Sequence, residues 1–214
     1  NRIHNKSFIS SYQKKIRENK YFTNINFKYS NRIGYSGENT SKILEIVKNK
    51  KVFNKIEFTD LVSFEIFAHT RWASVGSVNI SNTHPFIHKN DSDMNLCLMN
   101  GDIKNYNELI KNLKKRGKLL NYDKNCTSDL QPIPSLIFEK KFSLKKMLSG
   151  SYVLINFNTQ KPENIYIYKK GSQGIYYTLD IDRNLHFASD VYGLVNKSDN
   201  FKKLEKNGSF EINK

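Results

Sequence analysis

The stretch HTRWASVG at residues 69–76 is the part of this sequence that says most about its fold, because it places polar side chains directly after an apolar segment. The preceding residues, FEIFAH at 64–69, are short, aromatic and apolar, which predicts a buried strand that leads into a loop. A second polar stretch, MNGD at 99–102, follows another predicted strand, NLCLM at 95–99, and a third, TSD, occupies residues 127–129. Polar side chains presented by rigid strands are well placed to form a functional site.

Each of these stretches also has a purely structural interpretation. Arg71 can pair with a surface carboxylate, and Trp72 can belong to the core. Asn100 and Gly101 can form a plain type I′ turn, and Asp129 can be no more than the cap of a helix. Taken singly, the stretches favour this structural interpretation.

The rest of the chain predicts one domain of mixed α and β structure over residues 1–214, with no internal repeat. Ile9, Tyr12 and Ile16 are spaced for one face of an N-terminal helix. From residue 150 onward, strand-like stretches alternate with turn residues and predict a mostly antiparallel second half. Apolar spacing and capping residues predict further helices at about 40–47, 102–117 with Gly117 as the residue after its end, 129–141, and 143–148.

Length and composition bound the class of protein. The chain has 214 residues, of which 13% are aromatic, so it can build a core and is not expected to be disordered. No apolar run approaches the ~20 residues of a membrane helix, and the opening NRIHNKSF has no features of a signal peptide. The two cysteines, Cys97 and Cys126, form no CxxC motif, so neither a disulfide framework nor a metal site is indicated. We therefore expect a cytoplasmic protein without a metal or cofactor.

The strong positive charge suggests a protein that binds nucleic acid. The sequence has 35 Lys and Arg against 20 Asp and Glu, a formal net charge of +15. The excess is mostly lysine spread along the whole chain, and its densest run, KNLKKRGK at 111–118, falls on the solvated face and end of a predicted helix. A basic nucleic-acid-binding protein therefore stays the weaker hypothesis.

Taken together, six blocks of sequence resemble the glutaminase domain of the class II glutamine amidotransferases, most closely the branch that aminates fructose 6-phosphate. The resemblance runs from about Phe67 to the end of the chain, and the string HTRWA is its most specific part. The six blocks, in order, are AHTRWASVG at 68–76, NTHPF at 82–86, LMNGDIKNYNEL at 98–109, TSD at 127–129, LSGSYVLI at 148–155 and FASDVYGLV at 187–195.

The resemblance implies a fold and an activity. The fold is the α+β N-terminal-nucleophile hydrolase fold, a four-layer αββα sandwich, with an N-terminal part expected to be incomplete here. The activity is hydrolysis of glutamine to glutamate and ammonia. The ammonia would pass to a sugar-phosphate isomerase-type domain or subunit, through which the protein would form a homo-oligomer.

Site residues are carried over from the resemblance position by position. Arg71 matches the residue that binds the glutamine α-carboxylate, and Asp129 matches the one that binds its α-ammonium. A guanidinium suits the carboxylate, and a carboxylate suits the ammonium. The Asn100 side-chain amide and the Gly101 backbone N–H match the oxyanion hole, whose donors stabilise the charge that develops during attack. Three further positions match residues that line the glutamine pocket or brace its loop: Trp72, Ser74 and His84.

The resemblance does not extend to the nucleophile. In the family it is a cysteine that begins the mature chain, and its own α-amine serves as the base. Here residue 1 is Asn1, and we expect Cys97 and Cys126 to be packing or loop residues. Either a segment bearing the cysteine precedes this chain, or the chain is a degenerate glutaminase that binds glutamine as a regulatory module without cleaving it.

Overall fold

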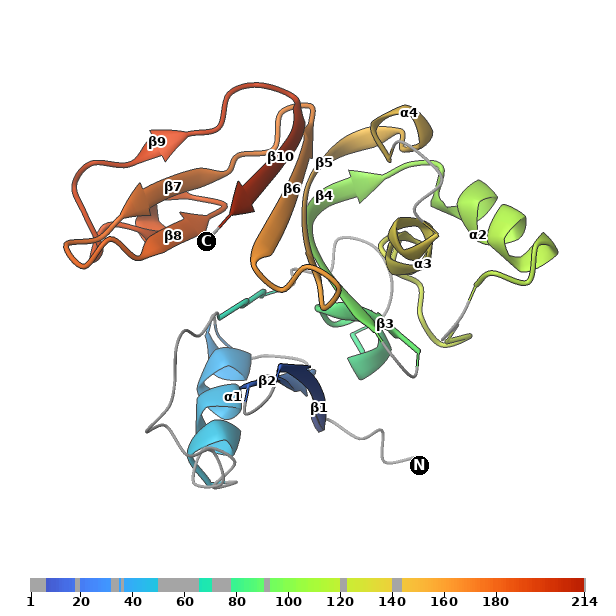
Figure 1. Ribbon diagram of the computed structural model, residues 1–214, viewed down its shortest axis with the longest axis horizontal. Helices are drawn as coiled ribbons and strands as arrows, with labels where there is room; N and C mark the ends of the chain where they lie inside the picture. Colours follow the sequence, from blue (N-terminus) through green and yellow to red (C-terminus); the bar gives the residue numbers. More distant parts are fainter. Residues whose placement is uncertain are drawn as a thin grey trace. The chain divides into compact units, whose positions relative to one another are not determined.

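A computed structural model of the chain describes residues 7–17, 20–31, 35, 37–49, 66–70, 78–90, 93–119, 123–139 and 144–213. The chain divides into two compact units (Figure 1). The first comprises Asn1–Phe86 and Tyr122–Ser128, and the second comprises Ile87–Asn121 and Asp129–Lys214. No helix within the described ranges is both long enough and apolar enough to cross a membrane.

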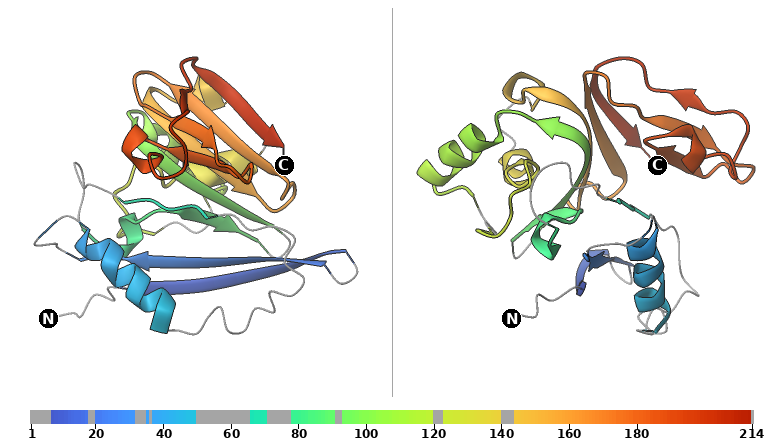
Figure 2. Two further views of the ribbon diagram at one scale, coloured as in Figure 1. Left: turned by 90° about the vertical axis from the view of Figure 1, so that its left-hand side faces the viewer. Right: turned by 180° about the vertical axis from the view of Figure 1, so that it is seen from behind.

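The first unit contains an antiparallel hairpin of β1 (Ser7–Arg17) and β2 (Lys20–Tyr29), drawn as a long ribbon in Figure 2. The prediction of an N-terminal helix from Ile9, Tyr12 and Ile16 is therefore wrong. The spacing of these residues suits a helix locally, but pairing with β2 along the whole of β1 satisfies the backbone of both segments.

Helix α1 (Glu38–Asn49) contacts β2 and confirms the helix predicted at about 40–47, with two further residues at each end. Residues 66–70 of this unit are irregular, so the strand predicted at 64–69 is wrong for the part that the structure describes. A short 3-10 helix, η3 (Ile80–Asn82), follows later in the chain.

The second unit is built on a five-stranded sheet in the order β10-β6-β5-β4-β3. A three-stranded sheet in the order β8-β7-β9 belongs to the same unit. The strands predicted after residue 150 are confirmed, and only the two-residue β9 has no counterpart among them. The strand bounds are β3 (Phe86–Lys89), β4 (Met94–Ile103), β5 (Gly150–Asn158), β6 (Asn164–Lys170), β7 (Tyr176–Leu179), β8 (Leu185–Ala188), β9 (Lys202–Lys203) and β10 (Gly208–Asn213).

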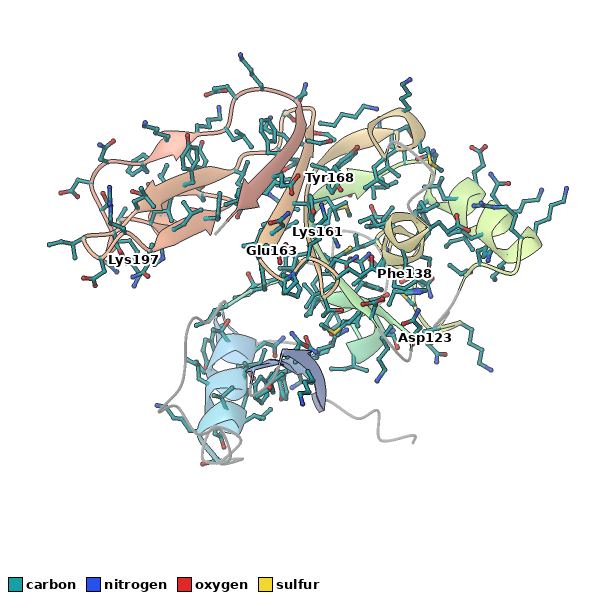
Figure 3. All side chains as sticks on the ribbon, in the orientation of Figure 1. Asp123, Phe138, Lys161, Glu163, Tyr168 and Lys197 are labelled. Carbon is teal, nitrogen blue, oxygen red and sulfur yellow. The ribbon has the colours of Figure 1, made fainter. Side chains whose placement is uncertain are left out.

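The five-stranded sheet is covered on both faces, as Figures 1 and 2 show. On one face Val153 and Ile167 pack with Ile175 and with Phe187 of the three-stranded sheet, forming a core between the two sheets. On the other face lie α2 (Tyr106–Lys115) and α3 (Ile133–Phe138). From α3 the Phe138 ring, labelled in Figure 3, packs 4.5 Å from the ring of His88 on β3. Mixed layers of this kind make the unit α+β.

The helices of this unit depart from their predicted bounds for identifiable reasons. Helix α2 begins at Tyr106 and not at residue 102, because β4 continues to Ile103, which pairs with Gly150 of β5. Its end is as predicted, since Gly117 follows the last turn with a φ of +63°. Helix α4 (Leu144–Met147) confirms the short helix predicted at 143–148.

Helix α3 is shorter than the predicted 129–141, and Pro132 is its N-cap. Asp129 is not the cap of this helix. Two prolines, Pro132 and Pro134, stand at the start of the helix and provide no backbone N–H groups, so a helix beginning at residue 129 would lose hydrogen bonds there.

Candidate functional site

The polar end of β4 places Asn100 and Gly101 where the strand leaves the core. Residues 94–99 of this strand are all buried, whereas Asn100 is exposed and Gly101 is half-buried. Both residues stay in the ladder, opposite Val153 and Tyr152 of β5, so they form no hairpin turn. The strand thus carries an amide side chain and a neighbouring backbone N–H out of an apolar interior.

Gly101 occupies a position that only glycine fits. Its φ is +112°, and a Cβ there would lie 2.2 Å from the Ser151 carbonyl oxygen and 2.8 Å from the Tyr152 Cα. Both neighbours are backbone atoms of β5, which cannot move aside without breaking the ladder. The absence of a side chain is what lets the β5 backbone lie this close to Gly101.

Asp129 is fixed to the same end of β4. Its Oδ2 accepts a hydrogen bond from the Ile103 N–H at 2.6 Å, two residues after Gly101 in the strand. A carboxylate that accepts from a backbone N–H makes one of the stronger hydrogen bonds of proteins. The second unit therefore brings Asn100, Gly101 and Asp129 to one end of one strand, although 26 residues separate Ile103 from Asp129.

In the first unit, the blocks NTHPF and TSD meet through Asn82, which is fully buried. Its side-chain oxygen accepts from the backbone N–H groups of Thr127 at 2.7 Å and of Ser128 at 3.1 Å. Its Nδ2 donates to the Thr127 hydroxyl at 3.0 Å. Asn82 thus orients the two residues that directly precede Asp129. The sequence prediction did not include Asn82, and its only signal was its place at the start of the block NTHPF.

His84 is buried in the first unit, between other rings. Its ring centroid lies 3.9 Å from that of His69 and 5.6 Å from that of Phe86. The preceding carbonyl, of Thr83, accepts from the Lys28 ammonium at 3.0 Å, and the same ammonium lies 5.5 Å from the Phe86 ring centroid. Burial lowers the pKa of Lys28 to about 8. His69 and His84 therefore connect the start of HTRWASVG with NTHPF, which suits a bracing role for His84.

The remaining predicted site residues lie at 71–77, outside the residues that the structure describes. They are Arg71, Trp72 and Ser74.

Neither cysteine is presented as a nucleophile. Cys97 is completely buried in β4, where burial raises the pKa of its thiol and the Asn156 amide lies 3.5 Å from its sulfur. Cys126 is also buried, in the loop before Thr127. Both observations agree with the prediction that these are packing or loop residues. Among the described ranges, no group of three or more His, Cys, Asp and Glu residues could hold a metal.

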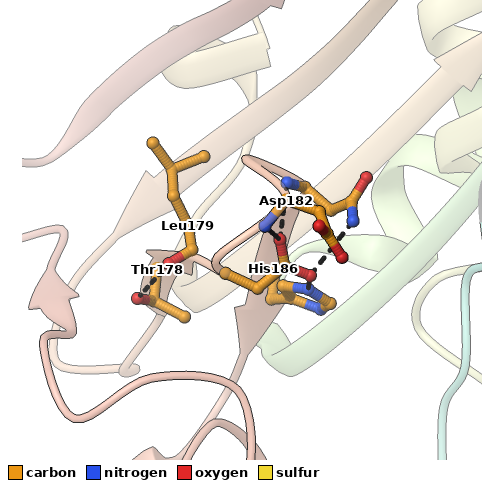
Figure 4. Close-up of polar contacts among 6 residues, drawn as sticks. Thr178, Leu179, Asp182 and His186 are labelled. Carbon is orange, nitrogen blue, oxygen red and sulfur yellow. Dashed lines mark hydrogen bonds and ion pairs between the residues drawn. The ribbon is translucent and has the colours of Figure 1, made fainter.

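Two charged clusters belong to the scaffold. In the β7–β8 hairpin (Figure 4), Asp180 Oδ2 lies 2.8 Å from His186 Nε2, and Asp180 Oδ1 accepts from the Asn184 N–H. The His186 hydrogen bond, with those of Asn184, lowers the pKa of Asp180 to about 2. These bonds close a tight turn. The basic run at 111–118 lies on exposed parts of α2 and its end, where Arg116 pairs with Glu139 at 3.0 Å.

Comparison with known proteins gives one family and several relatives. A family model described as a glutamine amidotransferase domain matches residues 55–212. The glutamine–fructose-6-phosphate aminotransferase (isomerizing) of Pyrococcus horikoshii is 34% identical over 141 residues, which are 61% of this chain and 22% of that protein. The enzyme of the same name from Methanococcus maripaludis is 32% identical over 128 residues, 59% of this chain and 19% of its own. The chain thus spans about a fifth of the length of these relatives.

Among solved structures, one described as the allosteric regulatory enzyme of purine biosynthesis superposes with a TM-score of 0.60. The match has 16% identity and covers 91% of this chain and 39% of the other. At this identity the likeness concerns the fold. It confirms the predicted class, the α+β fold of the N-terminal-nucleophile hydrolases.

Proposed function

Because this chain belongs to the glutamine amidotransferase domain family, we propose that it binds glutamine and splits the side-chain amide into glutamate and ammonia. One observation carries the proposal. The carboxylate of Asp129 is tied at 2.6 Å to the end of the strand that carries the Asn100 side chain and the Gly101 backbone N–H. A charged group for the substrate is thus held against the rigid strand that carries two donors for its reacting amide.

Each of these groups has a task in the proposed reaction. Arg71 holds the α-carboxylate of glutamine through its guanidinium fork, and Asp129 holds the α-ammonium. Attack on the side-chain amide places a negative charge on its oxygen, which accepts hydrogen bonds from the Asn100 amide and the Gly101 N–H. Such a donor contributes about 2.7–4 kcal/mol to lowering the barrier. Three residues line or brace the pocket: Trp72, Ser74 and His84.

The nucleophile in this proposal is a cysteine that precedes Asn1 in the native protein. Its α-amine takes the thiol proton as the sulfur attacks the amide carbon, and the amine returns that proton to the nitrogen as the C–N bond breaks and ammonia leaves. Water then hydrolyses the thioester to glutamate and frees the thiol. Cys97 is unsuited to this role, because it is buried and its pKa is raised, so the reactive thiolate is disfavoured.

The ammonia has a proposed destination. The relatives named above are glutamine–fructose-6-phosphate aminotransferases, several times longer than this chain. We place the amino acceptor in a sugar-phosphate isomerase-type domain or subunit, through which the protein forms a homo-oligomer.

The test begins with the first residue of the native protein, from intact mass or Edman sequencing. A native chain that begins with cysteine should release glutamate from glutamine, and a glutamine-like diazo ketone should label that cysteine while sparing Cys97 and Cys126. Asn100→Ala should lower turnover about a hundredfold or more with little change in glutamine binding. The exposed Asn196→Ala serves as the matched control.

Binding is tested separately on the chain that begins at Asn1. Calorimetry should show glutamine binding without hydrolysis, and Arg71→Lys should weaken it at least about tenfold, because lysine keeps the charge but loses the fork. Hydrolysis by this chain would mean a different nucleophile. No hydrolysis by a native chain proven to begin with cysteine would instead identify a regulatory glutamine-binding module.

A further inference from the structure

The connection between β6 and β7, residues 171–175, is fastened to the β4–β5 pair beside Gly101. The Ser172 N–H donates to the Ser151 hydroxyl at 3.0 Å, and Ser151 pairs with Asp102 of β4. At the other end of the connection, Ile175 is buried in the core, and its carbonyl accepts from the Leu204 N–H at 3.0 Å. The connection is therefore held at both ends within the second unit.

Gln173 stands in the middle of this connection, against the backbone of Gly101. Its Cγ lies 2.9 Å from the position that a Cβ on Gly101 would occupy, and the Ser151 carbonyl oxygen lies 2.2 Å from the same point. Gly101 is thus enclosed by the backbone of β5 and by the methylene stem of Gln173. A glycine has more backbone freedom than any other residue, so an enclosure of this kind decides how its peptide is oriented.

The Gln173 atom found against Gly101 is Cγ, which belongs to the methylene stem of the side chain. The side chain is half-buried, and its amide makes no hydrogen bond to any residue within the described ranges. Packing of the Cγ methylene group is therefore the contact through which Gln173 acts on Gly101.

We propose that Gln173 is a positioning residue, whose methylene stem holds the Gly101 peptide in the orientation needed to donate to the oxyanion. The proposal deepens the proposed function and rests on it, because Gly101 is the donor only if the site binds glutamine. Gln173 itself need not touch the substrate.

The test follows the Gly101 amide directly by NMR. The sequence contains two Asn-Gly pairs, Asn100-Gly101 and Asn207-Gly208. A chain labelled with carbonyl-¹³C asparagine and ¹⁵N glycine therefore gives two selected cross-peaks, and Gly208 is the internal control. Gln173→Ala removes the stem beyond Cβ, whereas Gln173→Met keeps the methylene groups and loses the amide.

We expect the order parameter of the Gly101 amide to be about 0.85 in the parent chain and to fall toward about 0.6 in Gln173→Ala. Gln173→Met should restore it, and Gly208 should not change in either variant. In a native chain that begins with cysteine, turnover should fall about fivefold in Gln173→Ala and less than about twofold in Gln173→Met, with little change in glutamine binding in either variant, because the oxyanion donor acts in the transition state.

Two results overturn the proposal: an unchanged Gly101 order parameter in Gln173→Ala, or a Gln173→Met variant that behaves like Gln173→Ala. Failure of the proposed function gives a different result. In that case glutamine shifts neither cross-peak in the parent chain, whatever the order parameters of the variants.

Discussion

Asp129 accepts a backbone hydrogen bond and has a second, proposed task in binding glutamine, and a pair of substitutions can distinguish the two. Its Oδ2 accepts from the Ile103 N–H at 2.6 Å, and its negative charge is proposed to bind the glutamine α-ammonium. Asp129→Asn keeps an oxygen that can accept from Ile103 but removes the charge. Asp129→Ala removes both.

The expected losses of stability follow from the burial of the partner. Ile103 is 1% exposed, so in Asp129→Ala its N–H is left without an acceptor, at a cost of about 2 kcal/mol. For a chain of this length that cost corresponds to a melting temperature lower by about 4–8 °C. Asp129→Asn exchanges a charge-assisted bond for a neutral one, which costs about 1 kcal/mol.

The expected losses of glutamine affinity depend instead on the negative charge of Asp129, which both variants lack. Both variants should bind glutamine at least about tenfold more weakly in calorimetry, since a tenfold change corresponds to about 1.4 kcal/mol. The melting temperature of each variant is measured by thermal unfolding, monitored by circular dichroism. Unchanged glutamine affinity in Asp129→Asn would make Asp129 a structural acceptor only, and an unchanged melting temperature in Asp129→Ala would refute the assigned hydrogen bond.

Three further predictions concern the scaffold. Gly101→Ala should lower the melting temperature by more than about 4 °C, because its Cβ would lie 2.2 Å from the Ser151 carbonyl oxygen at a φ of +112°; an equally stable variant would refute this geometry. Burial lowers the pKa of Lys28 from 10.5 to about 8, so between these pH values the unfolded chain binds more protons and stability should rise with pH. Urea unfolding should show this rise, up to about 3 kcal/mol, in the parent chain and not in Lys28→Met. The pKa of Asp180 is lowered from 3.8 to about 2, so the stability that the parent chain holds over Asp180→Asn at pH 6 should shrink as pH falls through that window, and a constant difference would count against the His186 bond.

Local sequence predicted much of the second unit. The apolar run NLCLM lies in β4, and the strand-like stretches after residue 150 form strands of the two sheets. These could be predicted because the spacing of apolar residues and the turn residues act over only a few neighbouring positions. Gly117 ended α2 as predicted, since a left-handed residue after a helix is a local requirement. The motifs also predicted Asn100, Gly101 and Asp129 as site residues, and in the structure all three lie at one end of β4.

Other features depended on segments far apart in the chain. The spacing of Ile9, Tyr12 and Ile16 is compatible with a helix, and only pairing with β2 makes the segment a strand. Ile103 looked like the first apolar residue of a helix, but its partner Gly150 keeps it in β4. Local spacing says which structure a segment can form, while its partner decides which one it does form.

The sequence by itself determined the family and predicted the kinds of side chain at the proposed site, because a motif fixes which residue types follow one another. The tertiary structure alone decided what holds those side chains in place. Asp129 binds Ile103 and does not cap α3, Asn82 orients residues 45 positions away, and Gln173 encloses Gly101. These contacts join distant segments, and no spacing along the chain specifies which segments meet when the core closes.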